Sequence, residues 1–163
     1  SDLMFVVNIG VNRPNITDKN WIYYLEKEFS FVRVSFPFNQ SDSVTPLGAS
    51  SISAEIAYGN DNPLPINKKK LSELVIKDLI KANILKESDE IIYLNTVDIK
   101  YAYVIFDKER KAAIKIIHEY LKKFDIIPFG RYGMWAYLWS DEAMLSGKKV
   151  AERLSRNKTI QST

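Results

Sequence analysis

Ser-Ile-Ser-Ala-Glu-Ile-Ala-Tyr, residues 51–58, alternates two kinds of side chain over most of its length. Successive residues of a strand point to opposite faces of a sheet. The alternation therefore predicts a strand in a sheet with one apolar face and one more polar face. The first set of side chains is Ile52, Ala54, Ile56 and Tyr58, and the second is Ser51, Ser53, Glu55 and Ala57.

A second predicted strand, residues 31–36 (FVRVSF), also carries a single charge within apolar sequence. Arg33 shares its face with Ser35. An unpaired buried charge is costly, so Arg33 and Glu55 need partners or water. One interpretation is a sheet with one wet face or a structural Arg33–Glu55 pair, which general frequencies favour. The other is a sheet whose polar face forms the floor of a substrate cavity.

The chain as a whole predicts an α+β domain with a mixed, mostly antiparallel sheet and helices packed on one side. Asn67 is placed to cap a helix in which Leu71 and Val75 recur at helical spacing. We expect one domain over residues 1–155 and a polar tail over 156–163. The predicted strands are residues 3–11, 20–25, 31–36, 51–58, 90–100, 101–106 and 126–129, and the predicted helices are 68–83, 108–124 and 140–154.

Length and composition indicate a globular domain with a substantial core. The chain has 163 residues, of which 46% are hydrophobic and 26% charged. Basic residues are spread along the chain and the net charge is +3, so we expect no nucleic-acid partner. There is no cysteine, and no apolar run approaches the roughly 20 residues of a membrane span, so we expect a cytoplasmic protein. The chain starts at Ser1 and enters strand-like sequence at Leu3, which indicates a fragment of a longer protein.

Several common catalytic motifs are absent from the sequence. It contains no P-loop, no Gly-x-Ser-x-Gly and no Gly-x-Gly-x-x-Gly, and no spacing typical of a metal site. His118 is the only histidine and lies beside the apolar stripe of the predicted helix 108–124. A catalytic dyad or metal site would need partners, and that helix offers only Lys115 and Glu119 near His118. We therefore interpret His118 as a helix-face residue.

The other distinctive stretch is residues 129–142, FGRYGMWAYLWSDE. Gly130 and Gly133 allow a positive φ or a close backbone approach, and Arg131 offers a planar set of donors. Alternating aromatic residues then lead into a helix whose first backbone N–H groups are available. The residues alone support two interpretations equally, a ligand-binding segment or a glycine-rich turn into an aromatic core. The alternating aromatic residues are Trp135, Tyr137 and Trp139.

The start of the last helix restricts which ligand suits it. Asp141 and Glu142 place negative charge where the helix dipole otherwise favours an anion. A neutral ring edge that carries carbonyl groups, such as the pyrimidine edge of a flavin, suits this helix start better than a pyrophosphate.

This segment resembles the UDP-galactopyranose mutases and their relatives, the protoporphyrinogen-oxidase-like and amine-oxidase-like flavoproteins. The mutase pattern is Gly-Arg-hydrophobic-Gly, a few residues with aromatics, and then Tyr-Leu-Asp-Met-Asp entering the last helix. Residues 130–141, GRYGMWAYLWSD, match its spacing without a gap, although Trp139 and Ser140 replace Asp and Met. Residues 7–11, 21–24 and 31–35 look like substrate-domain strands of the same relatives.

The resemblance implies that this chain is the substrate-side part of a longer FAD-dependent enzyme. Its relatives begin with a Rossmann-type FAD domain that carries Gly-x-Gly-x-x-Gly, which this sequence lacks. The implied partners are that N-terminal FAD domain and a small-molecule substrate such as a sugar nucleotide. The implied flavin contacts are Gly130, Arg131, Gly133, Ser140 and Asp141, and the implied substrate contacts are Arg33, Glu55, Trp135 and Tyr137.

Two other functions stay open. A parent enzyme of protoporphyrinogen-oxidase or amine-oxidase type would consume oxygen, whereas a mutase regenerates its reduced flavin without net oxidation. A stand-alone interaction domain without a cofactor is the second alternative, and an upstream Gly-x-Gly-x-x-Gly in the same reading frame would distinguish the flavoprotein from it. No general base is evident, so we assign no catalytic residue and expect the isolated chain to be inactive.

Overall fold

The computed structural model describes residues 2–59, 62–64 and 67–161, without the side chains of Asp2, Lys68 and residues 157–161. The end of the predicted polar tail, residues 162–163, therefore lies outside the described residues.

The chain divides into two compact units, residues 1–102 and residues 103–163. We call them the sheet unit and the helical unit and describe each by itself. The single substrate-side domain expected from the sequence stays a prediction.

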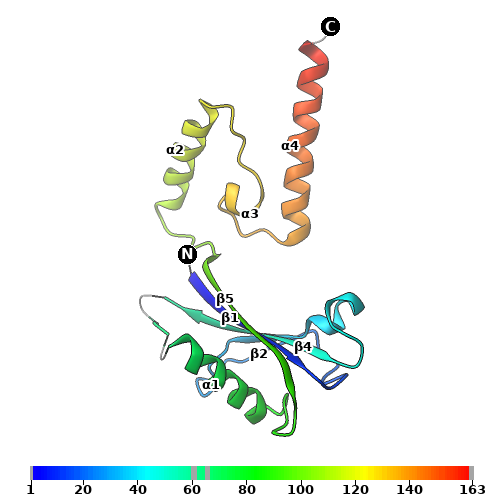
Figure 1. Cartoon of the computed structure of the whole chain (residues 1–163). Helices are drawn as coiled ribbons and strands as arrows, with labels where there is room; N and C mark the ends of the chain where they lie inside the picture. Colours follow the sequence, from blue (N-terminus) through cyan, green and yellow to red (C-terminus); the bar gives the residue numbers. More distant parts are fainter. Residues whose placement is uncertain (1, 60–61, 65–66, 162–163) are drawn as a thin grey trace. The chain divides into compact units, whose positions relative to one another are not determined.

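The sheet unit is built on a five-stranded sheet with the order β2-β3-β4-β1-β5 (Figure 1). β1 pairs with β4, β4 with β3, and β3 with β2, and all three pairings are antiparallel. β5 also runs antiparallel to β1, because Gly10 lies against Tyr93 and the Asn12 N–H donates to the Glu90 carbonyl. The predicted α+β fold with a mostly antiparallel sheet is confirmed. The strands are β1 Asp2–Val11, β2 Trp21–Tyr23, β3 Arg33–Ser35, β4 Ser50–Tyr58 and β5 Ile91–Tyr103.

Helix α1, Lys68–Lys81, packs against the apolar face of this sheet (Figure 1). Leu71, Val75 and Leu79 lie on the inner side of α1 and are fully buried. The predicted cap is present, since Asn67 Oδ1 accepts the backbone N–H of Lys70 at 3.0 Å. Removal of these apolar side chains from water is the main stabilising contribution in the sheet unit. The strand side chains of this core are Phe5, Val7, Ile9, Val11, Val34, Ile52, Ala54 and Ile56.

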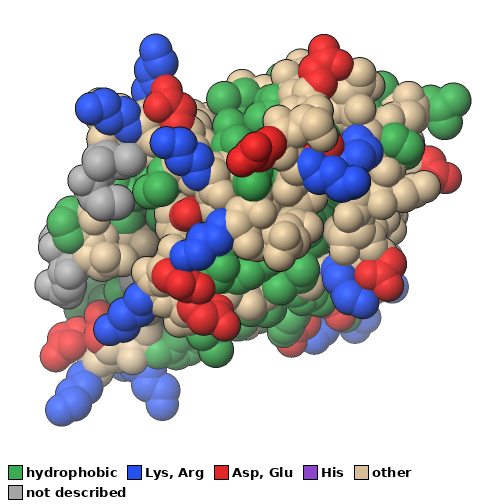
Figure 2. Space-filling view, turned by 90° about the horizontal axis from the view of Figure 1, so that it is seen from below, with side chains coloured by type: hydrophobic (Ala, Val, Ile, Leu, Met, Phe, Trp, Pro, Cys, Tyr) green, Lys and Arg blue, Asp and Glu red, His purple; other side chains and the backbone are tan. Residues whose placement is uncertain are grey.

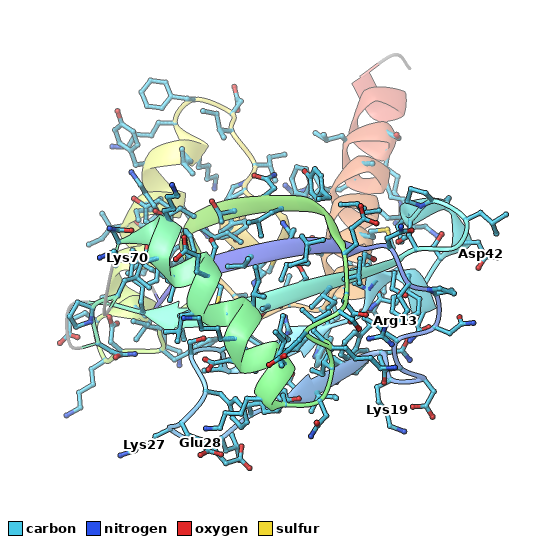
Figure 3. All side chains as sticks on the ribbon, turned by 60° about the horizontal axis from the view of Figure 1, so that its bottom comes forward. Arg13, Lys19, Lys27, Glu28, Asp42 and Lys70 are labelled. Carbon is cyan, nitrogen blue, oxygen red and sulfur yellow. The ribbon has the colours of Figure 1, made fainter. Side chains whose placement is uncertain are left out.

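An ion pair between Arg13 and Asp89 connects the segment after β1 to the turn between α1 and β5. Figure 3 labels the Arg13 side chain. Arg13 Nε and one terminal nitrogen each lie 2.7 Å from a carboxylate oxygen of Asp89, and the guanidinium also donates to the Ile84 carbonyl at 3.1 Å. The Asp89 side chain is only 5% exposed. The hydrogen bonds from Arg13 and from the Lys86 N–H hold the pKa of Asp89 below its usual value.

The helical unit contains α2 Arg110–Lys122, α3 Gly130–Gly133 and α4 Ser140–Gln161. Val104 is the only buried hydrophobic side chain among its described residues. The predicted apolar stripe of α2 is present, but three of its large side chains stay more than half exposed, Ile116 at 66%, Tyr120 at 59% and Ile117 at 55%. Within the described residues, no helix has the length and apolar character that a membrane span requires.

Several predicted element boundaries were wrong. The predicted strands 90–100 and 101–106 are one continuous strand, β5, which ends at Tyr103, so residues 104–106 lie outside it. Residues 126–129 form no strand, because they follow a turn with Asp125 at a φ of 55° and find no pairing partner among the described residues. Helix α4 continues beyond residue 154 to Gln161, where neither glycine nor proline interrupts it.

Asp89→Asn tests the contribution of the ion pair. Because the folded-state pKa of Asp89 lies below its unfolded value of about 3.9, the stabilisation is present above that value. It is lost as the pH falls through the lower folded-state pKa. We expect the variant to be less stable by about 1–3 kcal/mol at neutral pH and to lose less stability than the wild type on acidification.

Urea denaturation at a series of pH values measures this difference. Asp18→Asn is the matched control, because Asp18 pairs with Lys19 at a fully solvated site and should contribute little. Equal stability of wild type and Asp89→Asn at neutral pH would contradict the role assigned to the pair.

Candidate functional site

The polar face of the sheet carries a row of side chains centred on Arg33. Arg33 on β3 stands directly opposite Glu55 on β4 and Tyr23 on β2. Its Nε and one terminal nitrogen donate to the same Glu55 oxygen at 3.0 and 2.5 Å. Its other terminal nitrogen lies 3.4 Å from the Tyr23 hydroxyl, and the guanidinium carbon lies 5.8 Å from the centroid of that ring. The sheet register therefore assembles an Arg–Glu–Tyr group from three strands.

This group explains how two charges are accommodated in otherwise apolar strands. The side chains of Arg33 and Glu55 are 31% and 15% exposed, so each needs the other. The predicted need for a partner is confirmed. Because the Glu55 carboxylate binds one edge of the guanidinium, the plane of Arg33 is fixed on the sheet. A fixed planar cation is suited to phosphate or carboxylate groups.

Neutral polar side chains continue along the same face. The Ser53 hydroxyl donates to Asn8 Oδ1 on the neighbouring strand. The Thr45 hydroxyl donates to Ser51 Oγ at 2.9 Å. The alternation of residues 51–58 places Ser51 and Ser53 on this face, whereas Asn8 and Thr45 are brought to it only by the register of β1 and by the loop before β4.

Charged side chains are mixed in sign on one face of the molecule. Figure 2 shows Lys and Arg side chains interspersed with Asp and Glu over the face of the molecule that it presents. A surface that binds a polyanion would instead carry positive charges clustered over a wide area.

The run at residues 129–142 is held by local contacts in the helical unit. Gly130 has a φ of 71°, and its N–H donates to Ser146 Oγ at 2.8 Å. Arg131 donates to the Leu138 carbonyl at 3.3 Å, and its guanidinium carbon lies 4.6 Å from the centroid of the Tyr137 ring. The structure thus brings Arg131 and Tyr137 together. Gly133 is closely packed, because a Cβ there would lie 3.3 Å from the backbone of Pro128, which would have to move slightly.

Trp135 departs from the conformation expected from the sequence. The alternation of Trp135, Tyr137 and Trp139 suits an extended segment, but residues 130–133 form the helical turn α3 and Trp135 has a φ of 46°. A bulky residue in this left-handed region is strained. The Trp135 carbonyl accepts the Arg110 Nε at 2.9 Å and a second Arg110 nitrogen, which helps to hold this conformation.

Two residues of α2 that hold the run escaped sequence analysis. Arg110 gave no sequence signal, because its partner is a backbone carbonyl 25 residues away. His118 was interpreted as a helix-face residue, and the structure places its Nε2 at 3.1 Å from the Gly133 carbonyl. Because a carbonyl only accepts, His118 donates from this nitrogen. In the described part of the chain, no group of acidic and histidine side chains is arranged to hold a metal ion.

Backbone groups around Gly130 and at the start of α4 are open to a ligand. A Cβ built on Gly130 would meet no atom within 4 Å, so a flat group has room to approach this backbone. Ser140 and Asp141 lie in the first turn of α4, where backbone N–H groups have no partner within the helix. Glu142 accepts the Trp139 N–H at 2.8 Å, so its carboxylate stabilises the helix start. These features fit a ring edge with carbonyl groups.

Gly130→Ala tests the requirement for a left-handed residue at the start of this run. The added methyl meets no neighbour, so the cost comes from the backbone alone and should be about 1–2 kcal/mol. Gly147→Ala is the control, since Gly147 lies inside α4 and alanine should stabilise a helix interior by up to about 1 kcal/mol. Urea denaturation followed by tryptophan fluorescence measures both, and destabilisation by Gly147→Ala with none by Gly130→Ala would contradict these assignments.

Comparisons with known proteins give a likeness of fold. No protein-family model matches the chain. Among solved structures, it is similar to a crystal structure of reduced UDP-galactopyranose mutase, with a TM-score of 0.72 and 24% sequence identity. The similarity covers 83% of this chain and 29% of the mutase chain, so this chain spans less than a third of the mutase's length. The chain therefore shares its fold with part of that mutase.

Proposed function

We propose that this chain is the substrate-side domain of a longer FAD-dependent enzyme of the UDP-galactopyranose mutase type. In this proposal the polar face of the sheet is the floor of the substrate cavity. The observation that carries it is the Arg33 guanidinium, oriented by Glu55 and Tyr23 on the sheet face opposite α1. The fold shared with part of a mutase supports the same conclusion.

A sugar nucleotide suits the groups on this face. Its diphosphate is a dianion with pairs of oxygens that accept two parallel N–H bonds, so a guanidinium recognises it better than an ammonium group does. Glu55 receives both Arg33 donors on Oε1, and its second oxygen is an acceptor for a substrate hydroxyl. Arg33 therefore binds the substrate's charge, and Glu55 orients Arg33 and contacts a neutral part of the substrate.

The run at residues 129–142 supplies the flavin-facing part of the proposal. Gly130 and Gly133 keep the backbone free of side chains, Arg131 holds the run in shape, and Ser140 and Asp141 begin α4. Tyr137 and Trp135 contribute contacts toward the substrate. FAD, when bound in the parent enzyme, supplies the redox or covalent chemistry, whereas this chain binds and orients.

The isolated chain should neither bind FAD tightly nor catalyse a reaction. The groups assigned to the flavin reach only one edge of it, and most of a cofactor's surface must be buried for tight binding. Titration of FAD into the 163-residue chain, followed by flavin absorbance, measures this directly. Tight binding would contradict a divided flavin pocket, and a complete parent enzyme with bound yellow flavin would support it.

Arg33→Met should weaken the binding of UDP by at least about tenfold, because it removes the cation that Glu55 holds on this face. Arg33→Lys should also weaken it, since an ammonium cannot reproduce the planar contact. Arg153→Met on α4 is the control for loss of one positive charge and should have no effect. Amide chemical shifts during a UDP titration give the affinities, and circular dichroism confirms folding. Unchanged UDP affinity in folded Arg33→Met would exclude the sheet face as the phosphate site.

A further inference from the structure

A cavity on the polar face has a chemistry different from that of the Arg33 group. It has a volume of about 560 Å³ and lies in the sheet unit, between the β1–β4 floor, the loop before β4 and the start of β5. Among the described residues that line it, none carries a formal charge. Charged ligands are therefore disfavoured, because their desolvation would meet no compensating charge.

The floor of this cavity holds polar groups whose orientation is already fixed. Asn8 accepts the Ser53 hydroxyl on Oδ1, so its amide nitrogen is the donor end of the group, and no bond from that nitrogen occurs within the described residues. Ser51 accepts the Thr45 hydroxyl at 2.9 Å, which leaves its own O–H to donate. Both groups line the cavity. A ligand that enters it thus meets donors held in place by partners on the protein.

The rest of the cavity wall is apolar and includes an aromatic ring. Val44, Pro46 and Tyr93 line it, and Tyr93 is 57% exposed. Gly10 permits this position of Tyr93, because a Cβ on Gly10 would lie 2.9 Å from the Tyr93 Cβ. A flat aromatic face beside fixed donors matches a ring that has apolar C–H faces and hydroxyl groups at its edge.

We infer that this cavity is a binding site for a neutral carbohydrate ring. The ring packs on Tyr93, and its hydroxyl oxygens accept from Asn8 and Ser51. A purely apolar ligand is excluded by the same reasoning, since it would cover these donors without pairing them. The inference goes beyond the proposed function, because it needs neither the flavin nor the phosphate contact of Arg33.

The position of the cavity relates it to the proposed substrate floor. Ser51, Ser53 and Glu55 follow one another on the same face of β4, which places Ser51 and Glu55 about 13 Å apart along the strand. An extended molecule that carries a phosphate and a further sugar unit can contact both positions. The cavity would then select the neutral sugar while Arg33 binds the charged group.

Titration with methyl β-D-galactopyranoside tests the site in the unmodified chain. We expect amide chemical-shift changes at Asn8, Thr45, Ser51 and Tyr93, and smaller changes with galacturonate, whose carboxylate finds no partner there. Absence of changes at these residues up to the solubility limit of the glycoside would overturn the inference. Equal binding of the glycoside and galacturonate would also overturn it.

Tyr93→Ala should weaken the binding of the glycoside by at least about tenfold. Tyr93→Phe should retain most of the affinity because the ring remains. Tyr101→Ala is the matched control, since Tyr101 lies on the same strand at 61% exposure and does not line the cavity. Equal loss in both alanine variants, or no loss in a folded Tyr93→Ala, would refute the role of Tyr93.

A parallel titration with UDP separates this inference from the proposed function. If UDP changes the amide chemical shifts of residues around Arg33 and the glycoside changes none, the carbohydrate site is refuted and the proposed function stands. If the glycoside changes the amide chemical shifts of the cavity residues and UDP changes none, the carbohydrate site is supported and the phosphate role of Arg33 is refuted.

Discussion

The pairing of β1 with β4 is the constraint on which the rest of the sheet unit depends. It extends over nine residue pairs and fixes which side chains share a face. In this register Phe5 stands opposite Ile56 on the apolar face, and Asn8 stands opposite Ser53 on the polar face. A slip of one residue would exchange the two faces, so that α1 would meet serines and a glutamate. The hydrophobic core and the candidate site are therefore two consequences of one register.

The two faces of the sheet have different energetic roles. The face under α1 buries aliphatic and aromatic side chains and stabilises the unit. The opposite face contributes less to stability, because it carries polar groups that form hydrogen bonds in pairs, Arg33 with Glu55 and Asn8 with Ser53. Each pair holds its members in one orientation before any ligand arrives, which lowers the entropic cost of binding.

The helical unit shows the opposite balance. Its described residues bury almost no apolar side chain, and its conformation relies on polar contacts to backbone carbonyls from Arg110, Arg131 and His118. One of these carbonyls belongs to Trp135, whose left-handed backbone is strained. Such a segment is shaped by specific contacts more than by general burial, which suits a stretch proposed to line a cofactor pocket.

The sequence by itself determined the elements that depend on local patterns. The period-two alternation of residues 51–58 predicted a strand with two unlike faces, and Asn67 with Leu71 and Val75 predicted a capped helix with a buried side. These succeed because burial and capping act over a few neighbouring residues. Only the tertiary structure decided the partners of those faces. It brought Asn8 and Thr45 to the cavity, bound Arg110 to the Trp135 carbonyl, and left residues 126–129 without strand pairing, because contacts between distant residues depend on register and leave no local pattern.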